Sequence, residues 1–172
     1  LLYGWHPGSK ATTVGNELTR EADVLLAVGC RFADQTTSSY RAGITFNIPP
    51  TRLIHLDVDP GEIGKNYPAA VGLVADARAG LGQLLAALRS LRPAADWRSS
   101  PYTAEIQQRV AAWLAQLAPQ RAPRRQPPTI SYVLQELRTV LADDAIVVTS
   151  AGHAQAQVYQ EFPFRRPGCY VT

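Results

Sequence analysis

Three short groups of residues in the first half of the chain are suited to binding a nucleotide. Each follows an apolar run: Gly29-Cys30-Arg31, then Asp57-Val58, then Asp76-Ala77. A glycine lets the backbone approach a phosphate closely, and an arginine offers a planar set of charged donors. A carboxylate at the end of a strand can accept hydrogen bonds from ribose hydroxyls. Together the groups favour a nucleotide-shaped cleft. The alternative is that Gly29 only ends a strand and that the aspartates only cap turns.

A fourth group lies in the turn-rich start of the chain, where Gly4, Trp5 and His6 are consecutive. A loop of this kind either covers the edge of a core with its tryptophan or packs against a planar ligand. The residues alone leave both interpretations open.

A second candidate site follows the apolar run Ala145–Thr149, which is expected to be a strand. A small-residue turn and an expected helix come next, and such an arrangement can hold a phosphate on backbone N–H groups. The residues at this position are Gly152, His153, Ala154 and Gln155. For His153, a ligand contact and a structural role with satisfied hydrogen bonds both remain open.

The first three groups would be positioned by strands at Val24–Val28, Leu53–Asp57 and Val71–Val74. These short apolar runs lack clean alternation, which is typical of strands buried on both faces in a parallel sheet. In such a sheet, ligands bind at the carboxyl edge of the strands. Apolar spacing predicts helices over Val14–Ala22 and around Leu81–Leu88, and Asp59-Pro60 is expected to begin a short one. The fold class is therefore α/β.

The chain divides into three expected segments. Residues 1–90 form a parallel-sheet, Rossmann-like domain, and residues 91–128 form a proline-rich linker with one helix that docks back on a domain. Residues 129–172 begin a second α/β domain, with Thr129 as the N-cap of its first helix. Because the chain contains no methionine and ends on an apolar, strand-like run, we expect it to be a fragment.

Composition excludes several classes of function. The chain has 172 residues, 46% hydrophobic and 18% charged, which is typical of a protein that buries an ordinary core. Its net charge is only +3 and no basic stripe interleaves with aromatics, so nucleic acid is not an expected partner. Cys30 and Cys169 have neither disulfide nor metal spacing. With no apolar run long enough to span a bilayer and no signal peptide, we expect a cytoplasmic protein without membrane contact.

Four blocks of the sequence, taken together, resemble a known family. They are Tyr3-Gly-Trp-His, Ala22-Asp-Val-Leu-Leu-Ala-Val-Gly-Cys-Arg-Phe, Leu53-Ile-His-Leu-Asp-Val-Asp-Pro-Gly-Glu-Ile-Gly-Lys-Asn and Val74-Ala-Asp-Ala. In this order they resemble the central domain of thiamine-diphosphate enzymes, a DHS-like nucleotide-binding domain, and most of all acetolactate (acetohydroxy acid) synthase large subunits. Thr129 to Thr172 resembles the start of the diphosphate-binding domain of the same enzymes.

The resemblance implies an enzyme that decarboxylates a 2-keto acid and joins the two-carbon unit to a second keto acid, in branched-chain amino acid biosynthesis. Its cofactors would be thiamine diphosphate, Mg²⁺ and FAD, and the parent would be a homo-oligomer, a dimer or tetramer. The family's activating glutamate and its Gly-Asp-Gly…Asn magnesium segment have no counterpart in this chain. The resemblance implies no catalytic residue and no metal ligand here, so we expect the chain alone to be inactive and to bind FAD weakly.

Carried over residue by residue, the family's FAD contacts fall on Gly4, Trp5, His6, Gly29, Cys30, Arg31, Asp57, Val58, Asp76 and Ala77. Gly152, His153 and Ala154 would face the thiamine diphosphate tail, and Gln155 the flavin side.

The chain departs from the synthase pattern at two places. Arg31-Phe32 continues as Ala33-Asp34-Gln35 where synthases have Asp-Asp-Arg, and Gly152-His153-Ala154-Gln155 stands where they have Gly-Gln-His-Gln. The first departure favours FAD-free relatives, such as trihydroxycyclohexanedione hydrolases or catabolic acetolactate synthases. A non-catalytic dinucleotide-binding module and a structural remnant with an empty cleft are further alternatives. A binding module, however, would not require the second unit at 129–172.

Overall fold

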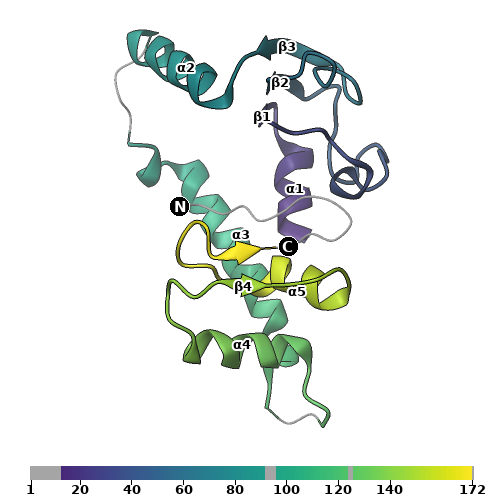
Figure 1. Ribbon diagram of the computed structural model, residues 1–172, viewed down its shortest axis with the longest axis vertical. Helices are drawn as coiled ribbons and strands as arrows, with labels where there is room; N and C mark the ends of the chain where they lie inside the picture. The colour runs from purple at the N-terminus through teal and green to yellow at the C-terminus, as the bar shows by residue number, and fades with distance from the viewer. Residues whose placement is uncertain (1–12, 92–95, 124–125, 172) are drawn as a thin grey trace.

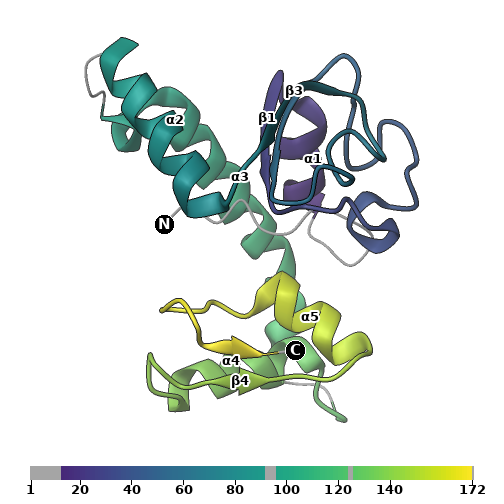
Figure 2. The same ribbon diagram turned by 45° about the horizontal axis from the view of Figure 1, so that its top comes forward.

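The computed structural model describes residues 13–91, 96–123 and 126–171, and Figure 1 shows the arrangement of their elements. A three-stranded sheet with two helices lies at one end, and a two-stranded sheet with two helices lies at the other. A long helix, α3, runs between these groups in Figures 1 and 2. The boundaries at residues 90 and 128 remain predictions for the domain organisation.

The first sheet consists of β1 (Val24–Val28), β2 (Arg52–Asp57) and β3 (Ala69–Val74) in the order β1-β2-β3. Both pairings are parallel, with Val28 opposite Leu56 and Leu56 opposite Leu73. The prediction of three parallel strands in one sheet is confirmed. All three strands therefore end at the same edge, and the segments that follow them meet there.

One face of this sheet carries the first hydrophobic core, which is built on Phe32, Phe46 and Leu53. Leu53 has 0% of its surface exposed. The Phe32 ring meets the rings of Phe46, His55 and Tyr67 edge-on, with centroids 5.3–5.4 Å apart. Burial raises the pKa of the Tyr67 hydroxyl, and a hydrogen bond with Thr37 partly offsets this. The packed rings fix the loops that follow β1 and β2 against the sheet.

The two connections between these strands are loops, and the expected helix starting at Asp59 is wrong. Residues 29–51 contain one short 3-10 helix, η1 (Asp34–Thr37), and residues 58–68 form turns. The Gly61 N–H donates to Asp59 Oδ1 at 2.8 Å, and Gly64 has a φ of +73°. The side-chain hydrogen bond and the left-handed glycine favour consecutive turns over helix propagation.

Two helices accompany the first sheet, α1 (Thr13–Glu21) before β1 and α2 (Ala77–Leu91) after β3. Both predicted helices are confirmed. Gly80 of α2 packs on β2, where an added Cβ would come within 2.6 Å of Leu56 Cδ1. The apolar stripe of α2 is only partly covered, because Leu81, Leu85 and Leu88 keep 41%, 49% and 62% of their surface exposed.

Helix α3 (Pro101–Leu117) is the helix predicted within the linker, and it is followed by the 3-10 helix η3 (Ala118–Arg121). A shorter 3-10 helix, η2 (Trp97–Ser99), precedes it. Ser100 caps α3 by accepting a hydrogen bond from the Thr103 N–H. Arg109 of α3 contacts Glu21 of α1 at 2.7 Å. The linker helix therefore docks on the first unit, as expected.

The second unit contains α4 (Ile130–Val140), β4 (Val147–Val148), α5 (His153–Glu161) and β5 (Tyr170–Val171). Thr129 caps α4 by accepting a hydrogen bond from the Tyr132 N–H, which confirms its predicted role. The strands are parallel, but β4 is shorter than the predicted Ala145–Thr149. The core of this unit is built on Leu134, Val158 and Phe162.

A buried polar cluster joins the second unit to η3. The Ser131 hydroxyl donates to Glu161 Oε1 at 2.9 Å, and Arg121 Nε lies 3.8 Å from Glu161 Oε2.

Across residues 13–91, 96–123 and 126–171, no helix combines the length and apolar character needed to cross a membrane.

Candidate functional site

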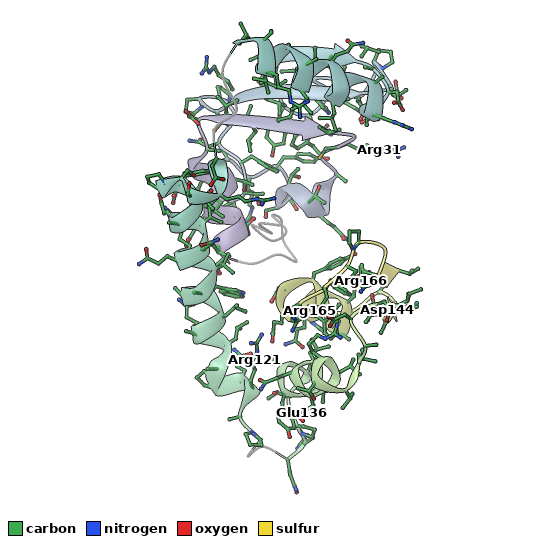
Figure 3. The ribbon with its side chains drawn as sticks, turned by 90° about the vertical axis from the view of Figure 1, so that its left-hand side faces the viewer. Arg31, Arg121, Glu136, Asp144, Arg165 and Arg166 are labelled. Carbon is green, nitrogen blue, oxygen red and sulfur yellow. The ribbon has the colours of Figure 1, made fainter. Side chains whose placement is uncertain are left out.

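The loop after β1 begins with Gly29 in the left-handed region, at a φ of +59°. Its N–H donates to the Leu56 carbonyl at 2.9 Å, which continues the sheet pairing for one more residue. Cys30 is half-buried and Arg31 is exposed. Figure 3 shows Arg31 beside the end of the first sheet. The chain therefore places a cationic side chain just beyond the strand, on a backbone whose left-handed turn favours glycine at position 29.

Asp57 ends β2 and is largely buried, with 7% of its surface exposed. Its Oδ1 accepts a hydrogen bond from the Asp59 N–H at 3.0 Å, so the carboxylate stabilises the turn. Val58, in contrast, is 71% exposed. A carboxylate has two oxygens with several acceptor positions, and stabilising the turn therefore does not prevent Asp57 from accepting a further hydrogen bond.

Asp76 follows β3 and caps helix α2. Its Oδ1 accepts a hydrogen bond from the Ala79 N–H at 3.0 Å, and its carbonyl accepts one from the Gly80 N–H at 2.8 Å. Ala77 is the first residue of α2. The turn and cap roles that the sequence left open for the aspartates are thus present, whether or not a ligand also binds here.

The structure brings the three predicted groups to one edge of the sheet. Gly29 pairs with Leu56, and the Ala75 N–H donates to the Asp57 carbonyl at 3.0 Å. Arg31, Asp57 and Asp76 therefore all lie at the carboxyl edge. Gly4, Trp5 and His6 fall outside the described residues, so their place in the cleft stays a prediction.

His55 and Asn66 form hydrogen bonds with the loop after β1, and neither was among the predicted site residues. His55 Nε2 lies 2.9 Å from the Cys30 carbonyl, and Asn66 Nδ2 donates to the Arg31 carbonyl at 3.0 Å. The alternation along β2 was a usable signal, because it places His55 on the same face as Leu53 and Asp57. A histidine in the middle of an apolar strand needs polar partners, and the loops at the carboxyl edge are the nearest source of them.

The second candidate site lies at the amino end of α5. Gly152 has φ +137° and ψ −169°, a conformation that is essentially restricted to glycine. An added Cβ would meet no atom of the described residues within 4 Å, so the space beside this backbone is open. His153 and Ala154 are exposed, and Gln155 is half-buried. Because His153 is exposed, its position does not support a structural role inside a core.

Each candidate site contains a group that can attract a phosphate, and the first also contains the carboxylates of Asp57 and Asp76. Arg31 lies at the first site, and the amino end of helix α5, the positive end of the helix dipole, lies at the second. The described part of the chain contains no group of three His, Cys, Asp or Glu side chains that could hold a metal ion. The guanidinium of Arg31 and backbone N–H groups at a helix start are donors that suit phosphate oxygens.

Comparison with known proteins shows what the chain is similar to. Residues 1–84 match the family described as "Thiamine pyrophosphate enzyme, central domain". This range contains all three strands of the first sheet and the segments at its carboxyl edge. Over these residues the chain is similar to the central domain of thiamine pyrophosphate-dependent enzymes, as the resemblance implied.

Three similar proteins are named acetolactate synthase or acetolactate synthase large subunit. The probable acetolactate synthase large subunit of Methanocaldococcus jannaschii is 44% identical over 84 residues, 49% of this chain and 14% of that protein. The acetolactate synthase of Mycobacterium avium is 30% identical over 171 residues, 96% of this chain and 26% of that protein. The large subunit of Parasynechococcus marenigrum is 36% identical over 152 residues, 86% of this chain and 22% of that protein. The chain thus spans about a quarter or less of these relatives.

Proposed function

We propose that the full-length protein is a thiamine diphosphate-dependent enzyme of the acetolactate synthase type. It would decarboxylate a 2-keto acid such as pyruvate and transfer the two-carbon unit to a second keto acid. The observation that carries this proposal is the continuity of the similarity, which extends over 96% of the chain in the Mycobacterium avium relative. A non-catalytic nucleotide-binding module would account for residues 1–84 but not for similarity in the second unit.

The second unit would hold the diphosphate tail of thiamine diphosphate. Gly152 has open space beside its backbone, and it is followed by the N-terminal turn of α5, where N–H groups suit phosphate oxygens. Gly152, His153 and Ala154 would contact the tail, and Gln155 would lie toward the flavin. The cofactor supplies the electron sink for decarboxylation, and the protein orients it. Mg²⁺ would be held by residues outside this chain.

The carboxyl edge of the first sheet would hold FAD. Arg31 would pair with the diphosphate, Gly29 would allow the backbone to approach it, and Asp57, Val58, Asp76 and Ala77 would border the adenosine side. Gly4, Trp5, His6 and Cys30 would complete the contacts. The support is the shared edge together with the exposure of Arg31 and Val58. Ala33 and Gln35 depart from the synthase pattern, so the FAD-free branch of the family is the second candidate.

The proposal also includes the domain boundaries, the oligomeric state, the location and the partners of the protein. We expect the domain boundaries at residues 90 and 128, a homo-oligomeric dimer or tetramer, and a cytoplasmic location. Small 2-keto acids would be the substrates, with neither nucleic acid nor membrane as a partner.

Titration of FAD into the full-length protein tests the flavin site. We expect Arg31→Ala to weaken FAD binding, because a hydrogen bond to a charged group contributes roughly 1.5–3 kcal/mol, about one to two decades of affinity. Arg52→Ala is the matched control, since Arg52 is also exposed but begins β2 at the opposite edge of the sheet. If folded Arg31→Ala bound FAD as tightly as the wild type, the flavin site would be abandoned in favour of the FAD-free branch.

A further inference from the structure

His55 is a buried polar residue that joins two loops at the carboxyl edge. Only 1% of its surface is exposed. Its Nε2 lies 2.9 Å from the Cys30 carbonyl in the loop after β1. Its Nδ1 accepts a hydrogen bond from the Gly64 N–H, at 3.4 Å, in the loop after β2. Because Nδ1 acts as an acceptor, the ring proton lies on Nε2, which donates to Cys30.

Asn66 makes a second connection between the same loops. Its Nδ2 donates to the Arg31 carbonyl at 3.0 Å and to the Phe32 carbonyl at 3.3 Å. Phe32 has a φ of +49°, an unfavourable conformation for a bulky residue, and its ring packs edge-on against His55. Three consecutive carbonyls, those of Cys30, Arg31 and Phe32, therefore accept hydrogen bonds from side chains of the second loop or of β2.

The direction of these carbonyls determines the direction of the neighbouring N–H groups. In a trans peptide the C=O and the N–H of the next residue point to opposite sides. When the Cys30 carbonyl points to His55, the Arg31 N–H must point away from His55. The Arg31 carbonyl, which points to Asn66, fixes the Phe32 N–H in the same way. Among the described residues, neither of these N–H groups donates a hydrogen bond.

We propose that His55 and Asn66 are positioning residues that aim the backbone N–H groups of Arg31 and Phe32 at the phosphate of a bound nucleotide. This inference rests on the proposed function of the carboxyl edge as an FAD site. The ligand chemistry is an anionic phosphate or diphosphate, which two adjacent N–H groups and the Arg31 side chain can bind together. Neither His55 nor Asn66 needs to touch the ligand.

The experiment compares FAD affinities in the full-length protein at a temperature where every variant is folded. His55→Leu removes both ring hydrogen bonds but keeps an apolar side chain in the core. His55→Gln keeps a donor that can reach the Cys30 carbonyl. Asn66→Ala removes the second connection from an exposed position. Leu53→Ala is the matched control, because Leu53 lies on the same face of β2 and contacts the core, not the loop carbonyls.

We expect His55→Leu to weaken FAD binding about tenfold or more, because it removes two hydrogen bonds and leaves the Cys30 carbonyl and the Gly64 N–H without their partner. His55→Gln should recover most of the affinity, and Asn66→Ala should lose several-fold. Leu53→Ala should lower the melting temperature, because it opens a cavity, yet bind FAD like the wild type. Recovery with glutamine, and normal binding in the destabilised control, would not occur if His55 only supported the core.

Each other outcome has a distinct meaning. If the wild type bound FAD and His55→Leu and Asn66→Ala bound it equally well, the positioning role would be wrong and the flavin site would stand. Equal losses in His55→Leu and Leu53→Ala would reduce His55 to a packing residue. If the wild type itself bound no FAD, the flavin site would fail, and the inference with it. Should His55→Leu not fold, Asn66→Ala carries the test, since its exposed side chain contributes little to the core.

Discussion

Gly152 is the residue whose conformation depends most strictly on its type. With φ +137° and ψ −169°, it occupies a region closed to residues with a Cβ, at the start of α5. We expect Gly152→Val to weaken thiamine diphosphate binding by tenfold or more, because the branched side chain would fill the open space beside the backbone and shift the helix start. Calorimetric titration of thiamine diphosphate into the full-length protein measures this.

Gly43→Val provides the matched control for that substitution. Gly43 also has a positive φ, +71°, and open space around it, but it lies in the loop between β1 and β2. It therefore reproduces the backbone strain, of order 1–3 kcal/mol, without touching the proposed site. Similar losses of affinity in both variants would show that strain, and not blocked access to the cofactor, was responsible.

The sequence predicted the positions of residues that directly follow a strand. It did not predict the contacts of residues whose partners lie in distant loops. Arg31, Asp57 and Asp76 each follow an apolar run, so the sequence alone places them at a common edge of a parallel sheet. The role of His55 could not be predicted in this way, because its partners Cys30 and Gly64 are 25 and 9 residues away. Their approach depends on the Phe32 cluster, which no local pattern encodes.

At the scale of elements, α3 is held on α1 by an ion pair. Arg109 bonds to Glu21 and Glu105, both at 2.7 Å. The hydrogen bond from Arg109 lowers the pKa of the Glu21 carboxyl below its ordinary value of 4.5. A lowered pKa means that the pair stabilises the folded state above the ordinary value and that the contribution is lost as the pH falls through the lowered one.

We therefore expect Arg109→Gln to reduce the free energy of unfolding at pH 7 by at most about 1 kcal/mol, as is usual for an exposed pair. The difference from the wild type should vanish at low pH. A double-mutant cycle with Glu21→Gln, measured by denaturant unfolding at several pH values, isolates the Arg109–Glu21 term. A coupling that stayed constant down to the lowest pH would be incompatible with this contact.

Element types were largely predictable, but the connections between them were not. The apolar runs gave β1 with the same bounds as the structure, Val24–Val28, and gave β2 and β3 to within two residues. The helix expected at Asp59 is a series of turns, because the Asp59 side chain and Gly64 offer local hydrogen bonds and a left-handed conformation that compete with a helix. In the second unit, β4 is shorter than its apolar run, since it pairs only with the two residues of β5.

For the whole molecule, the described residues form two separate hydrophobic cores with α3 between them. The first is centred on Phe32 and Leu53 and the second on Leu134 and Phe162. Apolar side chains remain exposed on the first sheet and on α2, including Leu26 at 49% and Leu88 at 62%. Where such side chains form a contiguous patch, the exposed apolar surface is typical of contact with other protein. The similar acetolactate synthase of Mycobacterium avium is about four times as long as this chain, and its additional length could supply such contacts.

The proposed acetolactate synthase activity is tested by identifying the product that the full-length protein forms from pyruvate. With thiamine diphosphate and Mg²⁺ present, two pyruvates should give one acetolactate and one carbon dioxide, and omission of thiamine diphosphate should abolish both. If protein saturated with thiamine diphosphate left pyruvate unchanged, or released carbon dioxide without acetolactate, the assignment to the acetolactate synthase type would be contradicted.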